Sequence, residues 1–226
     1  EPHTFKDRFW RMEKQTGKGS VAANAAIRSQ AAAAGVMLLT PREYDAAFGS
    51  AAAVLANPHA AALLARGLKE ATLQWTDAET GLACKARADH AGRCLVDLKS
   101  AARIDPRQFA SAAIRLGYHG QFAFYEDGLR ANGIEPVDAP HMIVVESAMP
   151  HDVIVYRMPP AVIEVGRHLY RSLLARLKVC RETNQWPGRA PEPIEFVMPA
   201  WSGAGDDGDD GELMFPDETE AEGAEP

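Results

Sequence analysis

The fold is decided by residues 82–99, which read LACKARADHAGRCLVDLK. Two runs suited to β-strands flank a turn, so this stretch predicts an antiparallel hairpin. Asp97 and Lys99 are two residues apart and therefore project from the same face of their strand. A three-residue loop at residues 91–93 keeps Asp89 on that face, whereas a two-residue turn sends it to the other.

Two carboxylates and an amine on one sheet face make a chemically useful group. Oxygen ligands suit Mg²⁺, which also keeps water and substrate phosphate in its shell. A lysine beside them can orient an attacking water and offset charge on the phosphate. We therefore interpret Asp89 and Asp97 as metal ligands and Lys99 as catalytic, with Val96 and Leu98 facing the core. The alternative, an exposed hairpin with ordinary surface charges, stays open because Asp-x-Lys alone is common.

Further motifs lie on both sides of the hairpin. Glu70 precedes its strands at the end of a helix-like run, and residues 117–125, GYHGQFAFY, open an expected helix. In this order of Glu, Asp, Asp-x-Lys and Gln-x-x-x-Tyr, the chain resembles the PD-(D/E)xK nuclease superfamily. Within it, five short stretches resemble the RecB-like exonucleases of the RecE, or exodeoxyribonuclease VIII, type: residues 75–81, 84–89, 96–99, 117–121 and 186–188. The resemblance covers roughly residues 40–201.

The resemblance implies an α/β fold with a restriction-endonuclease-like mixed central sheet flanked by helices. It implies an enzyme that hydrolyses double-stranded DNA from an end with Mg²⁺, or Mn²⁺ in its place, in phage-type recombination. Arg87 is expected either to contact phosphate or to pair with a nearby carboxylate. The implied catalytic residues are Lys99, Glu70, Asp89 and Asp97, the metal ligands are Asp89, Asp97, Glu70 and the Leu98 carbonyl, and the DNA contacts are Gln121, Tyr125, Tyr118 and Arg87.

The resemblance also implies partners, and the chain departs from it in two places. A single-strand annealing protein and a ring-like homo-oligomer are expected. An iron–sulfur cluster is not expected, because only three cysteines exist and their spacing does not suit one. The family carries a Gly-x-x-x-His helix, whose histidine serves the active site, before a Leu-Glu-Pro-like phrase. Residues 1–5 look like the end of that phrase, so we expect the histidine and the first helices to be missing. Two alternatives therefore stay open: a structure-specific endonuclease, or a truncated, inactive module that binds DNA or a partner.

Composition separates a body from a tail. The formal net charge is −7, yet ten of the 31 acidic residues lie in residues 203–226, which contain no Lys or Arg. The remaining 21 acidic residues face 24 basic ones, so the body is mildly basic and compatible with DNA. We expect a nuclease domain over 1–202 and an acidic, disordered tail over 203–226. Few cysteines, no apolar run of membrane-spanning length and no visible signal peptide indicate the cytoplasm.

Local signals place the remaining elements. Thr40, Pro41 and Glu43 form a capping box with proline at the first helical position, and Asp105-Pro106 repeats the cap-plus-proline start. Helices are expected over about 20–35, 41–56, 58–67, 106–117, 118–131 and 160–184, and strands over 73–76, 82–89, 94–99, 142–145 and 153–156.

Overall fold

The computed structural model describes residues 8–13, 16–188, 190 and 192–197. The chain divides into two compact units, Glu1–Asn184 and Gln185–Pro226. Every helix and strand of the described residues belongs to the first unit. The expected acidic tail at 203–226 and the phrase at residues 1–5 lie outside the described residues.

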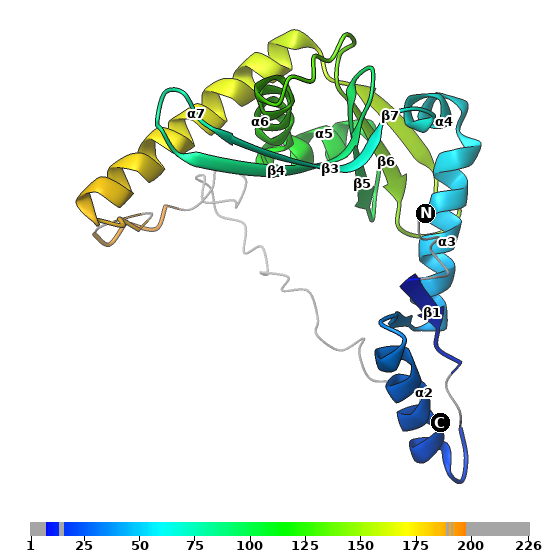
Figure 1. The fold of residues 1–226 in the computed structure, drawn as a ribbon. Coiled ribbons are helices and arrows are strands. Elements are labelled where there is room, and N and C mark those ends of the chain that lie inside the picture. Colours follow the sequence, from blue (N-terminus) through cyan, green and yellow to red (C-terminus); the bar gives the residue numbers. More distant parts are fainter. Residues whose placement is uncertain (1–7, 14–15, 189, 191, 198–226) are drawn as a thin grey trace, which may run out of the picture. The chain divides into compact units, whose positions relative to one another are not determined.

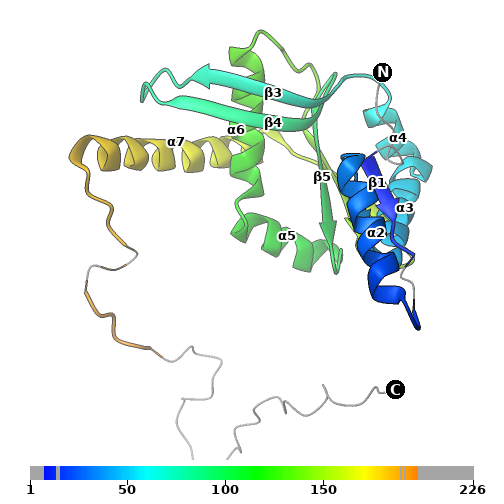
Figure 2. The same ribbon diagram turned by 60° about the horizontal axis from the view of Figure 1, so that its bottom comes forward.

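A five-stranded mixed sheet forms the centre of the first unit, in the order β3-β4-β5-β6-β7. β5 and β6 run parallel, and the other neighbours run antiparallel. β3 and β4 extend together and cross α6 (Figure 2). This is the mixed central sheet that the sequence predicts. The strands are β3 (Leu68–Thr76), β4 (Ala83–Ala91), β5 (Leu95–Ala101), β6 (His141–Glu146) and β7 (Val153–Arg157).

The helices begin where their capping residues predict. Thr40 accepts the Glu43 N–H while the Glu43 carboxylate accepts the Thr40 N–H, which is the expected capping box. Asp105 Oδ1 accepts two N–H groups from the first turn of the next predicted helix. The helices are α2 (Ser20–Ala33), α3 (Pro41–Ala56), α4 (Pro58–Leu64), α5 (Pro106–Arg115), α6 (Tyr118–Ala131) and α7 (Pro160–Thr183).

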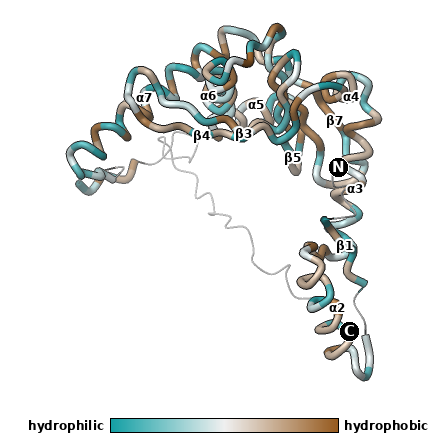
Figure 3. Tube along the Cα trace, viewed as in Figure 1, coloured by the Kyte–Doolittle hydropathy of each residue, from teal (hydrophilic) through white to brown (hydrophobic). Residues whose placement is uncertain are grey.

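Apolar side chains pack on both faces of the sheet. One core joins strand residues such as Leu73 and Val144 to Phe109 of α5 and Phe122 of α6. The other joins Val96 and its neighbours on β6 to α3 and α4. In Figure 3 the hydrophobic segments gather around β5 and β7, between the two sets of helices. Burial of both faces fits the near-continuous apolar run of β6.

Close helix packing fixes the position of α6, which the site depends on. A side chain at Gly166 of α7 would lie 2.0 Å from the carbonyl oxygen of His119, so the two backbones need glycine to approach this closely. At the other end of α6, a side chain at Gly128 would lie 2.7 Å from the ring of Trp75 on β3. α6 is therefore held between α7 and the sheet (Figure 1).

One small sheet was not predicted. β1 (Phe9–Arg11) pairs in parallel with β2 (Met37–Leu39), and Arg11 forms an ion pair with Asp45 of α3 at 2.8 Å. Three-residue strands carry too little alternation to be recognised from sequence. Among the described residues, no single helix is long and apolar enough to cross a membrane, and α3 and α4 meet that test only as a pair bent by 92°.

Candidate active site at the fork between β4 and β5

β4 and β5 pair briefly and then separate. Their ladder holds only His90 opposite Val96 and Ala91 opposite Leu95, while β4 continues along β3. Where the strands part, Oδ2 of Asp89 accepts the backbone N–H of Leu98 at 2.9 Å. The Asp89 carboxylate thus takes the place of a ladder acceptor and lies at the opening of the fork.

The turn of this hairpin differs from the prediction by one residue. The loop has three residues, as expected, but they are Gly92, Arg93 and Cys94 rather than residues 91–93. A side chain at Gly92 would lie 2.4 Å from the carbonyl oxygen of Arg66. The connection between α4 and β3 therefore passes so close to position 92 that only glycine fits there. The shift brings Asp89 level with Asp97 instead of residue 95, so the two acids are closer than the predicted register implies.

Asp97 is the most constrained residue of the fork. It is 2% exposed, its Oδ1 accepts a hydrogen bond from Gln121 Nε2 at 3.0 Å, and its Oδ2 lies 2.5 Å from Lys99 Nζ. Burial raises the pKa of Asp97, and the charge of Asp89 raises it further, against the opposing effect of Lys99. The ammonium group of Lys99 thus pairs with Asp97, while the carboxylate of Asp89 accepts, among the described residues, only the Leu98 N–H, so the fork can accept a further cation.

Lys99 and Gln121 connect the fork to the start of α6. Lys99 Nζ lies 4.8 Å from the ring centroid of Tyr118, a cation–π contact, and its side chain is 18% exposed. Tyr118 and Gln121 are three residues apart, so both face β5. Tyr125 lies one turn farther along α6 and packs half-buried against the core, with its ring 6.4 Å from that of Phe124. The structure thus brings Tyr118 and Gln121 to the fork and gives Tyr125 a packing position.

Two predicted features differ in the structure, and one open alternative is resolved. Glu70 is not at a helix end; it lies inside β3 with a φ of 53° and pairs with Arg87 at 2.9 Å. Of the two roles left open for Arg87, the structure shows the carboxylate partner. Leu98 is 38% exposed rather than buried, because the core beneath α3 and α4 reaches Val96 and not beyond. We name the group of Asp89, Asp97, Lys99 and Gln121 the fork site.

The donors of the fork site fit a small, hard cation. No group of three or more His, Cys, Asp or Glu side chains is arranged to hold a metal ion within the described ranges. Mg²⁺ does not need such a cage, because it commonly binds through one or two carboxylates and completes its shell with water and phosphate. Asp97 is buried, Asp89 supplies a second carboxylate beside it, and the carbonyl of Leu98 is the adjacent backbone oxygen. These oxygens would hold the ion. For Glu70 to join them as a ligand, its ion pair with Arg87 would first have to break.

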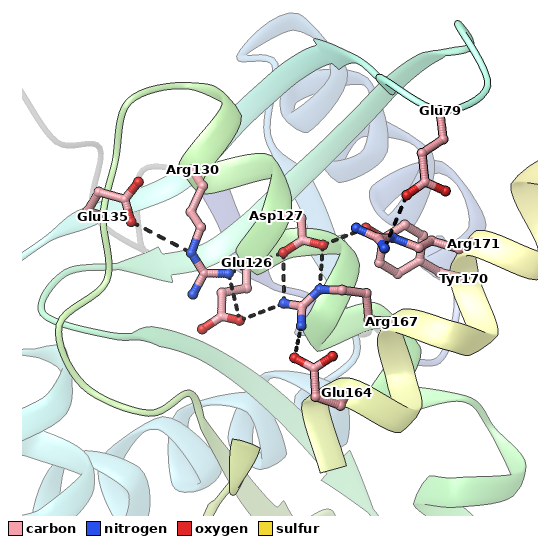
Figure 4. Close-up of polar contacts among 9 residues, drawn as sticks. All are labelled: Glu79, Glu126, Asp127, Arg130, Glu135, Glu164, Arg167, Tyr170 and Arg171. Atoms are coloured by element: carbon pink, nitrogen blue, oxygen red, sulfur yellow. Dashed lines mark hydrogen bonds and ion pairs between the residues drawn. The ribbon is translucent and has the colours of Figure 1, made fainter. Parts of the chain in front are cut away.

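A second ionic group joins α6 to α7. Nε and Nη2 of Arg167 donate to the two oxygens of Asp127 at 2.7 and 2.8 Å, and the Tyr170 hydroxyl donates to Oδ2 at 2.5 Å (Figure 4). A cavity of about 710 Å³ borders this group and does not reach Asp97 or Lys99. Sequence reasoning missed the group, because the contacts that join α6 to α7 link residues 40 or more apart. We name it the α6–α7 cluster: Glu79, Glu126, Asp127, Arg130, Glu135, Glu164, Arg167, Tyr170 and Arg171.

Comparisons with known proteins agree with this fold. Residues 1–197 match the family model described as a PDDEXK-like domain of unknown function, DUF3799. The crystal structure of a protein from Eubacterium rectale, named "Putative exonuclease", superposes with a TM-score of 0.51 at 14% identity and covers 80% of this chain and 79% of that one. At this identity, the likeness concerns the fold. No curated protein sequence matches the chain.

The sheet order and the acids of the fork thus coincide with a family match over most of the chain. The chain belongs to the DUF3799 family of PDDEXK-like domains and has their restriction-endonuclease-like fold.

Proposed function

We propose that this protein is a metal-dependent deoxyribonuclease that degrades duplex DNA from an end, as the RecE-type resemblance implies. The observation that carries the proposal is the fork site: Asp89 and Asp97 side by side, with Lys99 bound to Asp97. A PDDEXK-like domain is the setting in which acids and a lysine so arranged serve hydrolysis. The exonuclease mode draws further support from the fold shared with the Eubacterium rectale protein, whose name is that of an exonuclease.

Each residue of the fork site has a distinct role in this proposal. A bound Mg²⁺ would supply positive charge for the phosphate and lower the pKa of the attacking water. Gln121 holds one oxygen of Asp97 in place, and the Leu98 N–H fixes the carboxylate of Asp89. Lys99 is held between Asp97 and the ring of Tyr118, from where its ammonium group can orient the water and oppose charge on the phosphate. Contacts to the sugar–phosphate backbone would make cleavage insensitive to the DNA sequence.

The test is digestion of two DNA substrates of the same sequence, one linear and one covalently closed. With Mg²⁺, the protein should release nucleotides from the linear duplex and leave the closed circle intact, and a chelator should stop the reaction. Lys99→Ala should lower the rate by about 100-fold or more. Nicking of the circle would identify an endonuclease instead. No cleavage of either substrate would identify a binding module.

A further inference from the structure

Helix α5 lies in a segment of the chain that begins and ends at the fork site. The segment that contains it begins after Lys99 on β5 and ends at Tyr118, whose ring lies under the Lys99 ammonium group. Figure 2 shows α5 beside the end of β5 and joined to α6. Any long ligand that enters the fork from this side must therefore pass over α5.

The surface of this segment is basic. Arg103, Arg107 and Arg115 are all exposed, and no ion pair engages them within the described part of the chain. The one acidic residue between Lys99 and Tyr118 is Asp105, whose carboxylate caps the N-terminus of α5. By contrast, Arg130 and Arg167 on the neighbouring helices are bound to carboxylates. The positive charge of α5 therefore remains available.

The arginines lie on the solvent side of an amphipathic helix. Phe109 and Ala113 bury one side of α5 in the main core. Arg107, Ser111 and Arg115 follow one another at intervals of four residues, so they line the opposite side. At a rise of 1.5 Å per residue, Arg107 and Arg115 are about 12 Å apart along the helix. Phosphates of one DNA strand advance by about 3.4 Å along the duplex axis, so this strip matches three or four of them.

We propose that this strip of α5 binds the sugar–phosphate backbone of the DNA duplex next to the fork site. The inference rests on the proposed function, because it assigns the substrate's path into the same site. Arginine suits this role, since its planar group donates two hydrogen bonds to phosphate oxygens. Such contacts hold the duplex in register without reading its bases.

The test is a DNA-binding measurement that does not depend on cleavage. The anisotropy of a labelled blunt duplex of about 20 base pairs is followed without divalent metal at several salt concentrations, and each phosphate contact contributes about 0.9 to the slope of log K against log salt. Arg107→Gln with Arg115→Gln should lower that slope by about 2 and weaken binding at least tenfold. The matched control is Arg176→Gln with Arg181→Gln, exposed residues near the end of α7 that lies away from β5 (Figures 1 and 2).

The outcomes separate this inference from the proposed function. A reduced slope in the α5 variant alone supports the inference, whether or not the wild-type protein cleaves DNA. An unchanged slope, an equal loss in the α7 control, or no DNA binding by the wild type overturns it. If the wild type degrades linear DNA while the α5 slope is unchanged, the nuclease proposal stands and this inference fails alone.

Discussion

The fork site and the α6–α7 cluster are two ionic groups that meet α6, and the pKa of the buried acid is shifted in opposite directions in the two groups. Asp127 has both oxygens bound to Arg167 and receives a third hydrogen bond from Tyr170. Burial acts to raise the pKa of Asp127, but those hydrogen bonds outweigh it and lower the pKa. At the fork, burial prevails and raises the pKa of Asp97.

We interpret this difference as that between a group that stabilises the fold and a group that can bind a ligand. A carboxylate held by a bidentate arginine has its charge compensated and gains little from another cation. A buried carboxylate that has one lysine partner and a second acid beside it is incompletely compensated, and this is common where ions or substrates bind. We therefore propose a structural role for the α6–α7 cluster and a chemical role for the fork site, although both include residues of α6.

The largest expected effect is on catalysis at the fork. Asp97→Asn should abolish cleavage of linear duplex DNA with Mg²⁺, because it removes the charge of a proposed metal ligand. The free energy of unfolding should stay the same or rise, since a costly buried charge is removed. Nuclease assays and urea unfolding of the same preparation measure both. Retained cleavage at the wild-type rate would show that the fork is not the active site.

The next largest effect is on stability at the cluster. Arg167→Met should cost about 3 kcal/mol, because it leaves the carboxylate of Asp127 without its main partner. The side chains of Arg167 and Asp127 are only 15% and 21% exposed, so water compensates poorly. Urea unfolding measures the loss, with Arg176→Met on the exposed side of the same helix as the control. Equal stability of the two variants would mean that the cluster does not hold α6 to α7.

The dependence on pH should have opposite signs at the two acids. The ordinary pKa is 3.8 for both, and it is raised at Asp97 and lowered at Asp127. Asp97 contributes stability below pH 3.8 that is lost as the pH rises through its folded pKa, whereas the contribution of Asp127 is present above pH 3.8 and is lost as the pH falls through its folded pKa.

Asn variants at these two positions make the comparison measurable. Relative to the wild type, Asp97→Asn should gain stability as the pH rises from about 3.5 to 7, and Asp127→Asn should lose it. Unfolding free energies at four or five pH values determine both slopes. Slopes of the same sign would remove the distinction between the two groups.

The smallest effect concerns the ring beneath Lys99. Tyr118→Leu should lower the cleavage rate by about threefold to tenfold, since a partly exposed cation–π contact is worth about 0.5–1 kcal/mol or slightly more. Tyr118→Phe keeps the ring and should retain most of the rate. Equal rates for the Leu and Phe variants would indicate that the ring does not position the lysine.

Local sequence signals predicted most of the fold. Helix starts at Thr40-Pro41 and Asp105-Pro106 depend on capping within a few residues, so they can be recognised without tertiary structure. Asp97 and Lys99 share a face because strand alternation requires it.

Features set by distant partners could not be predicted in this way. The one-residue shift of the hairpin loop follows from the passage of the Arg66 carbonyl over Gly92. The position of Glu70 inside a strand, and its pairing with Arg87, depend on the register of β3 and β4. The pair of Asp127 and Arg167 joins residues 40 apart, which no local pattern reveals.

Magnesium binding, measured by titration calorimetry without DNA, tests the central distinction most directly. The wild type and Asp127→Asn should bind Mg²⁺ alike, and Asp97→Asn should bind at least tenfold more weakly, because only the fork site is proposed to hold the ion. Equal binding by Asp97→Asn and the wild type, or a loss confined to Asp127→Asn, would contradict the assignment of chemistry to the fork and of structure to the α6–α7 cluster.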